Sequence, residues 1–70
     1  MIKEFPFKIN DLAVCINVNM RSRGYMIHKV TNIDEYCEWI EIEKDGNREW
    51  LNCSNFMKVN DTRITRYLYG

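Results

Sequence analysis

The sequence is poor in the residues from which disulfide-stabilised domains, metal sites and membrane spans are built. Among its 70 residues are one proline, one histidine and three cysteines. Cys15, Cys37 and Cys53 are an odd number without a Cys-x-x-Cys pair, so the sequence indicates neither a disulfide framework nor a metal site. No apolar run approaches the length of a membrane span, and the first residues lack the hydrophobic segment of a secretion signal. We therefore expect a soluble cytoplasmic protein with reduced thiols and no cofactor or metal.

A catalytic group of residues is missing as well. Nucleophilic catalysis needs a thiol or hydroxyl beside a base, and His28 with one of the cysteines is the only such combination. A lone histidine among scattered cysteines is usually structural. The carboxylates between Glu41 and Glu49 are typical of a solvated strand face rather than of a paired acid and base. The sequence therefore predicts a protein that is not an enzyme.

The length and the charge of the chain limit the number of domains and the classes of partner that it can bind. Seventy residues form a single domain, 1–70, with one small core, because a chain of this length buries only roughly 60% of its unfolded surface. The formal net charge is zero, but residues 34–50 contain seven acidic and two basic residues, whereas both flanking segments are basic. An even overall balance disfavours a general coat for nucleic acid, which depends on clustered cations. It leaves room for a local basic patch.

The strongest structural signal is the segment Glu35–Cys53, in which two alternating runs flank a Lys-Asp-Gly-Asn turn at 44–47. Asp-Gly in such a turn predicts a β-hairpin, because a tight turn needs positive φ angles. One face of the hairpin is then apolar, and Trp39, Glu41 and Trp50 share the other. A one-residue bulge would instead bury Trp50. Without a bulge, the turn pairs Glu43 with Arg48, Glu41 with Trp50 and Ile40 with Leu51.

Shorter patterns complete a predicted sheet. Alternation over residues 11–20 predicts a strand with one buried side. A second strand is expected over 25–33 with a bulge near His28-Lys29, and a short closing strand over 57–59 after a tight or 3₁₀ turn at 54–56. Phe5-Pro6-Phe7 predicts a clasp over the core, and residues 60–70 are expected to be extended rather than a marginal short helix. The side of the first strand predicted to be buried consists of Leu12, Val14, Ile16, Val18 and Met20.

This order of elements resembles the Src-homology-3-like small β-barrels, which include the Tudor-like and KOW-like domains. A first strand ends in a polar loop before Gly24, and Asp45-Gly46 forms the tip of the distal hairpin. The segment Ser54–Val59 is similar to the Ser-Asn-Tyr-Val turn and last strand of that group. The resemblance implies an all-β fold, a small five-stranded antiparallel barrel over about 11–59, with the N-terminal clasp 1–10 and the C-terminal segment 60–70 packed on it.

The resemblance covers few of the group's ligand-binding positions. Trp39 stands where the peptide-binding members have a ligand-binding tryptophan, and Phe56 matches the aromatic residue of the turn. The first loop, however, is basic through Arg21 and Arg23 where those members are acidic, and Cys53 replaces a proline. Binding of proline-rich peptides is therefore not implied, and the Tudor-like aromatic cage is not recognisable.

Exposed tryptophans often anchor protein partners, because each combines a large apolar surface with an N–H donor. We therefore predict a non-catalytic module that docks on a larger protein partner. The size and the frequent asparagine and isoleucine suit a small accessory protein, phage- or virus-encoded, that inhibits or redirects a larger machine. The residues predicted to bind protein are Trp39, Glu41, Trp50 and Phe56.

The alternative is a nucleic-acid-binding or ribonucleoprotein-associated barrel. Basic residues interleaved with aromatic ones hold phosphates and stack on bases, and KOW-like domains contact RNA or DNA through such loops. Pairing of a partner strand with an open sheet edge is a third route to binding. No interaction with a membrane is expected. The residues predicted for the nucleic-acid alternative are Arg21, Arg23, Tyr25, Lys29, Arg63, Arg66, Tyr67 and Tyr69.

Overall fold

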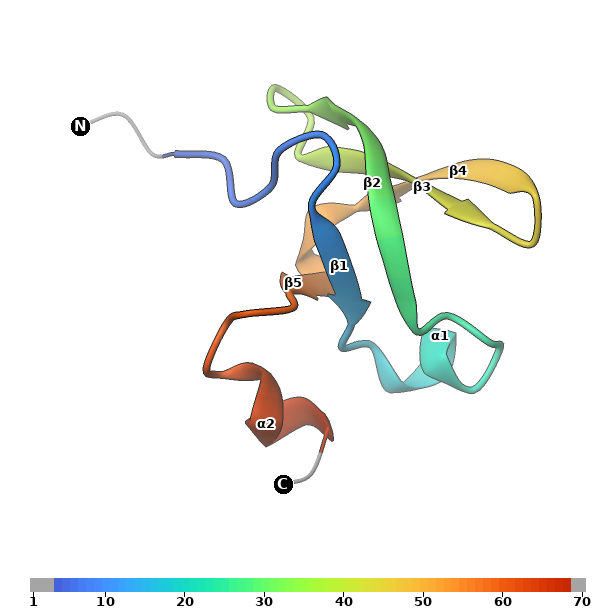
Figure 1. Cartoon of the computed structure of the whole chain (residues 1–70), viewed down its shortest axis with the longest axis vertical. Helices are drawn as coiled ribbons and strands as arrows, with labels where there is room; N and C mark the ends of the chain where they lie inside the picture. Colours follow the sequence, from blue (N-terminus) through green and yellow to red (C-terminus); the bar gives the residue numbers. More distant parts are fainter. Residues whose placement is uncertain (1–3, 69–70) are drawn as a thin grey trace.

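A computed structural model describes residues 4–68 and has five short strands with three helical turns (Figure 1). The strands are all antiparallel to their neighbours and form one sheet in the order β4-β3-β2-β1-β5. The elements are β1 (Leu12–Cys15), α1 (Val18–Arg21), β2 (Ile27–Asp34), β3 (Trp39–Lys44), β4 (Asn47–Asn52), the 3₁₀ helix η1 (Cys53–Asn55), β5 (Phe56–Lys58) and α2 (Ile64–Leu68).

Strand β2 holds the two parts of the sheet together. Its first residues pair with β1 and its later residues with β3, and the pairing with β3 is irregular between Val30 and Asn32. A bulge in this strand was predicted, but near His28-Lys29, slightly before its position in the structure. The five-stranded antiparallel sheet is confirmed. β4 and β5 are its edges, and the described residues show no pairing between them that closes the sheet into a barrel.

The β3–β4 hairpin has the predicted register. Glu43 lies opposite Arg48, and the register continues without a bulge to Ile40 opposite Leu51. The two central turn residues, Asp45 and Gly46, have φ angles of 53° and 82°. Positive φ at both positions matches the turn to the twist of the strands, which is why Asp-Gly fixes this connection.

The structure corrects the prediction of a single strand over residues 11–20. The strand ends at Cys15, because the Asn17 side chain accepts hydrogen bonds from the N–H groups of Asn19 and Met20 and so begins α1. The side predicted to be buried is buried only in part: Leu12 is 47% exposed and Val18 73%, and Ile16 is intermediate. Val14 is buried there all the same, and Met20 is buried from α1.

The core lies on the opposite side of β1. Ala13 and Cys15 are fully buried, and their small side chains leave space for the rings packed with them. The described part of the N-terminal segment contributes to this core, since Phe7 is a core residue and the Asn10 N–H donates to the Val30 carbonyl at 2.8 Å. The buried cluster consists of Phe7, Ala13, Cys15, Met20, Val30, Ile40, Ile42 and Phe56.

Residues Ile64–Leu68 form a helix, so the extended conformation predicted for the C-terminal segment was wrong there. Asp61 accepts a hydrogen bond from the Arg63 N–H at 2.9 Å, and the Thr65 hydroxyl donates to the Thr62 carbonyl. These local bonds hold the turn from which α2 begins. In the described part of the chain, no helix has the length and apolar character needed to cross a membrane.

Candidate functional site

The outer face of the β3–β4 hairpin carries both tryptophans. Ile40 and Ile42 are fully buried, so Trp39 and Glu41, which alternate with them, point to the opposite side of β3. Trp50 of β4 lies opposite Glu41 in the register. The two tryptophans are each 41% exposed. Three of the residues predicted for protein binding are therefore brought together, and we call this surface, with Asp34 at the end of β2, the tryptophan face.

An open hollow lies on the tryptophan face. It has a volume of about 220 Å³ and is lined by Asp34, Cys37, Trp39 and Trp50. Asp34 lies opposite Trp39 in the pairing of β2 with β3, whereas Cys37 comes from the connection between these strands. One half-buried carboxylate and two half-exposed indole rings therefore border a single space.

Hydrogen bonds fix the carboxylates of this face. Oδ1 of Asp34 accepts the backbone N–H groups of Tyr36 and Cys37, both at 3.1 Å. The Thr31 hydroxyl lies 2.9 Å from Oε1 of Glu41 and 3.1 Å from the Glu41 carbonyl oxygen. The acidic groups are therefore held in position rather than left as freely rotating surface side chains.

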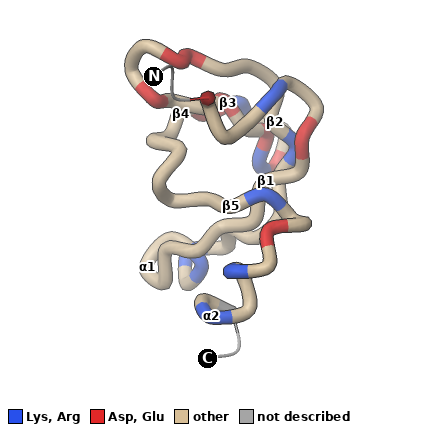
Figure 2. The backbone as a smooth tube through the Cα atoms, turned by 90° about the vertical axis from the view of Figure 1, so that its left-hand side faces the viewer, with Lys and Arg blue, Asp and Glu red and all other residues tan. Residues whose placement is uncertain are grey.

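The surroundings of the hollow are acidic. Asp34, Glu35 and Glu38 lie at the end of β2 and in the turn that follows. Figure 2 shows acidic positions gathered at the upper end of the molecule. Between Val30 and Glu43 the sequence contains no lysine or arginine. The part of the tryptophan face that comes from β2, β3 and the turn between them is thus acidic and attracts cationic groups, whereas Arg48 on β4 lies opposite Glu43.

Phe56 lies apart from this face. It begins β5 and is only 4% exposed, within the buried cluster. Its ring contributes to the core, and the structure does not bring it to the surface beside Trp39 and Trp50.

Five residues of the nucleic-acid alternative fall into two groups. Arg21 and Arg23 lie at the end of α1 and in the loop after it, whereas Arg63, Arg66 and Tyr67 belong to the segment around α2. Both helices lie at the lower end of the molecule in Figures 1 and 2. The exposed Lys29 is on β2, opposite Leu12 of β1. Tyr69 lies outside the described residues.

Two residues of the nucleic-acid alternative form contacts within the fold. The Arg63 guanidinium forms an ion pair of 2.8 Å with Asp61, and this pairing lowers the pKa of the Asp61 carboxyl to about 2. The Tyr25 hydroxyl donates a hydrogen bond of 2.7 Å to Oε2 of Glu49. Tyr25 is therefore held against β4 rather than presented to a base.

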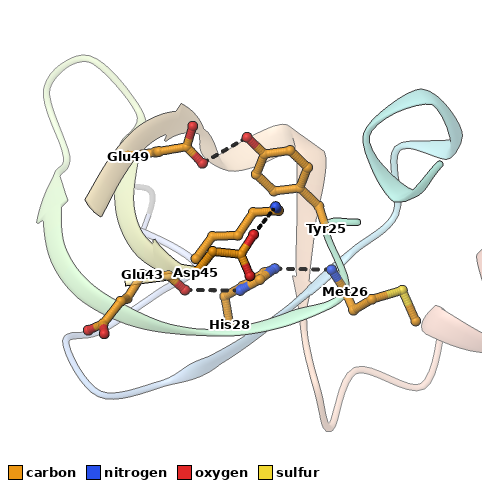
Figure 3. Close-up of polar contacts among 7 residues, drawn as sticks. Tyr25, Met26, His28, Glu43, Asp45 and Glu49 are labelled. Carbon is orange, nitrogen blue, oxygen red and sulfur yellow. Dashed lines mark hydrogen bonds and ion pairs between the residues drawn. The ribbon is translucent and has the colours of Figure 1, made fainter. Parts of the chain in front are cut away.

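Tyr25 belongs to a polar cluster that the sequence did not reveal (Figure 3). The Lys44 ammonium lies 5.0 Å from the centroid of the Tyr25 ring and pairs with Asp45 at 2.7 Å. The ring of His28 meets that of Tyr25 edge-on, with the centroids 6.0 Å apart. The cluster joins the loop after α1 to the tip of the β3–β4 hairpin. Its members come from two separate stretches, 25–28 and 43–49, which the pairing of β2 with β3 and of β3 with β4 brings together.

Comparison of the chain with protein-family models, curated proteins and solved structures finds no match. The function of this protein is therefore inferred from the geometry of its own residues.

Proposed function

We propose that this protein is a non-catalytic binding module that docks on a larger protein through its tryptophan face. The observation that carries the proposal is the exposure of Trp39 and Trp50 at the border of one hollow. A domain of 70 residues has few large apolar side chains with which to build its core. Two tryptophans kept at the surface are available instead to bury apolar area against a partner.

The charge of the face suggests the kind of partner. Glu41, Asp34 and the neighbouring glutamates repel phosphate groups and attract lysine and arginine. We infer that the partner presents a basic or amphipathic segment. Such a segment covers the indole rings with its apolar parts and pairs its cations with the carboxylates.

The finer assignment of the fold is part of the same proposal. A five-stranded antiparallel sheet, whose strand β2 is shared by both of its parts, supports a Src-homology-3-like barrel. A scaffold of this size has little space for a catalytic cleft, and it suits a small accessory protein, phage- or virus-encoded, that modulates a larger machine in the cytoplasm.

Binding of nucleic acid is the second candidate. It is favoured by one observation, the position of α1 and α2, with Arg21 and Arg66, at the same end of the molecule. This end lies away from the acidic turn after β2 (Figure 2). The two candidates thus use different surfaces, and variants of each surface separate them.

The test is capture of partners from the native cell with the wild-type protein and two groups of variants. We expect Trp39→Ala and Trp50→Ala each to abolish recovery of a partner protein, while the double variant Arg21→Ala with Arg23→Ala retains it. Tyr36→Ala is the control, since Tyr36 is 97% exposed beside the face but does not line the hollow. Capture that survives both tryptophan variants but is lost with the arginines and falls steeply with salt would identify the nucleic-acid candidate.

A further inference from the structure

We propose that the hollow of the tryptophan face binds the side chain of an arginine from the partner, with its guanidinium against the indole rings of Trp39 and Trp50 and paired with the carboxylate of Asp34. This inference depends on the proposed docking function and specifies the chemistry that the hollow recognises. Three features support it: the positions of the two indole rings, the hydrogen bonds that orient the Asp34 carboxylate, and the charge around the hollow.

The register places the two indole rings at opposite corners of a cross-strand square. Trp50 pairs with Glu41 and Trp39 with Asn52, so the tryptophans are diagonal neighbours on adjacent strands. Diagonal neighbours are separated by about 7–8 Å, which leaves room between large side chains for a flat group. Both rings border the same hollow of about 220 Å³. The hollow is therefore open to a single side chain from outside.

Asp34 supplies a fixed anion at the edge of this space. Its Oδ1 is occupied by the N–H groups of Tyr36 and Cys37. Within residues 4–68, its Oδ2 receives no hydrogen bond. Because the two N–H groups hold the carboxylate in one orientation, Oδ2 is a ready acceptor for a cationic donor.

The charge around the hollow favours a cationic ligand over a neutral one. Among the described residues, those that line the hollow include one carboxylate, Asp34, and no lysine or arginine. Arg48, two residues before Trp50 on β4, lies opposite Glu43 in the register. A ligand that carries its own positive charge satisfies both the carboxylates and the faces of the indole rings, whose π-electrons attract cations.

The geometry favours arginine over lysine. A guanidinium is planar, so it stacks on an aromatic ring while its N–H groups donate in the plane to a carboxylate. An ammonium is compact and strongly hydrated, and it cannot stack in this way. The two indole rings and the Asp34 carboxylate therefore match the planar guanidinium of arginine better than the compact ammonium of lysine.

The probe is a short, flexible Gly/Ser peptide with one central arginine, compared with the same peptide carrying citrulline, which is neutral and nearly isosteric. Trp39 and Trp50 are the only tryptophans in the chain, so intrinsic fluorescence reports on the hollow directly. We expect a saturable change with the arginine peptide, roughly tenfold weaker binding of the citrulline peptide and intermediate binding of a lysine peptide.

Asp34→Asn tests the carboxylate, because asparagine retains an oxygen that accepts from Tyr36 and Cys37 but loses the charge. We expect this variant to weaken arginine binding about fivefold or more. Asp45→Asn at the exposed hairpin tip is the matched control and is expected to bind as the wild type does. Unchanged near-ultraviolet circular dichroism establishes that the variants are folded.

Equal affinity for the arginine and citrulline peptides overturns the proposal, as does a fluorescence signal that never responds to arginine. A lysine peptide that binds more tightly than the arginine peptide also contradicts it. These failures differ from failure of the docking function. If the tryptophan variants abolish capture of the partner while the citrulline peptide binds equally well, docking stands and recognition of guanidinium does not.

Discussion

The hydroxyl of Tyr25 lies 2.7 Å from Oε2 of Glu49 and joins the loop after α1 to strand β4 (Figure 3). Glu49 is on the side of β4 opposite to Trp50, because the two residues are adjacent in one strand. The hydrogen bond therefore lies on one face of the β3–β4 hairpin, and the tryptophan face is the other. Lys44 strengthens the link, since its ammonium lies over the Tyr25 ring.

Removal of this hydroxyl is expected to destabilise the protein measurably. In Tyr25→Phe the ring and its contact with Lys44 remain, but Glu49 loses a donor. We expect the free energy of unfolding to fall by about 1 kcal/mol, because water replaces part of a half-buried bond to a carboxylate. Urea denaturation measures the loss. Tyr36→Phe, at a fully solvated position, is the control and is expected to change little.

Because of the same hydrogen bond, we expect the free energy of unfolding to depend on pH in the alkaline range. The hydrogen bond to Glu49, followed by burial and the negative charge of Glu49, raises the pKa of Tyr25 above its usual value of 10.0. The neutral phenol is thus favoured in the folded state. Its stabilising effect is complete below about pH 10 and is lost as the pH rises through the raised pKa of the folded state.

Unfolding curves of the wild type and Tyr25→Phe at increasing pH test this prediction. We expect the difference in the free energy of unfolding between the two proteins to shrink above about pH 10. A difference that stays constant or grows in that range contradicts the role assigned to the Tyr25 proton.

His28 of β2 contacts the loop after α1 and strand β3 through its two ring nitrogens. Nε2 accepts a hydrogen bond of 3.0 Å from the Met26 N–H, and Nδ1 lies 3.1 Å from the Glu43 carbonyl oxygen. This pattern requires a neutral ring with its proton on Nδ1. In His28→Ala we expect a loss of about 1–2 kcal/mol in stability.

Hydrogen exchange at the Met26 amide gives a local measure of the His28 bond. The amide is expected to exchange faster in His28→Ala, while the exposed neighbouring substitution Lys29→Ala leaves it unchanged. Equal exchange in all three proteins is inconsistent with a bond from Met26 to the imidazole.

The two sides of β1 predict opposite responses to substitution. Leu12 is nearly half exposed, so Leu12→Thr is expected to change the free energy of unfolding by no more than about 0.5 kcal/mol. Ala13 is fully buried against large side chains, and Ala13→Leu is expected to cost about 1–3 kcal/mol through overpacking. Denaturant unfolding of both variants compares the two sides directly. If Leu12→Thr proves the more damaging, the strand faces the other way.

The hairpin was predictable because its signals are local. Asp45-Gly46 specifies a turn with two positive φ angles, and that turn alone fixes which residues of β3 and β4 lie opposite each other. Alternation then places Ile40 and Trp39 on different faces. The residues that share the tryptophan face could therefore be predicted from the sequence, but the hollow between them could not.

Strand β1 was not predictable in the same way. Alternation over residues 11–20 establishes two sides but does not identify which one meets the core. The larger side chains suggested the side of Leu12 and Val18, whereas the fold places Ala13 and Cys15 inward. Phe7 from the clasp and Phe56 from β5 fill the core there, and residues so distant in the chain leave no local pattern.

The sequence by itself determined the antiparallel sheet and the β3–β4 hairpin, and it left two alternatives for the hairpin: an exposed pair of tryptophans beside acidic residues, or a bulge that buries Trp50. Only the tertiary structure decided the inward side of β1, the burial of Phe56 and the approach of Asp34 and Cys37 to the tryptophans. Turn chemistry and alternation act between neighbours in the chain and can be read along it. Which surface becomes the inside depends instead on the volumes of side chains that meet only when the whole chain is folded.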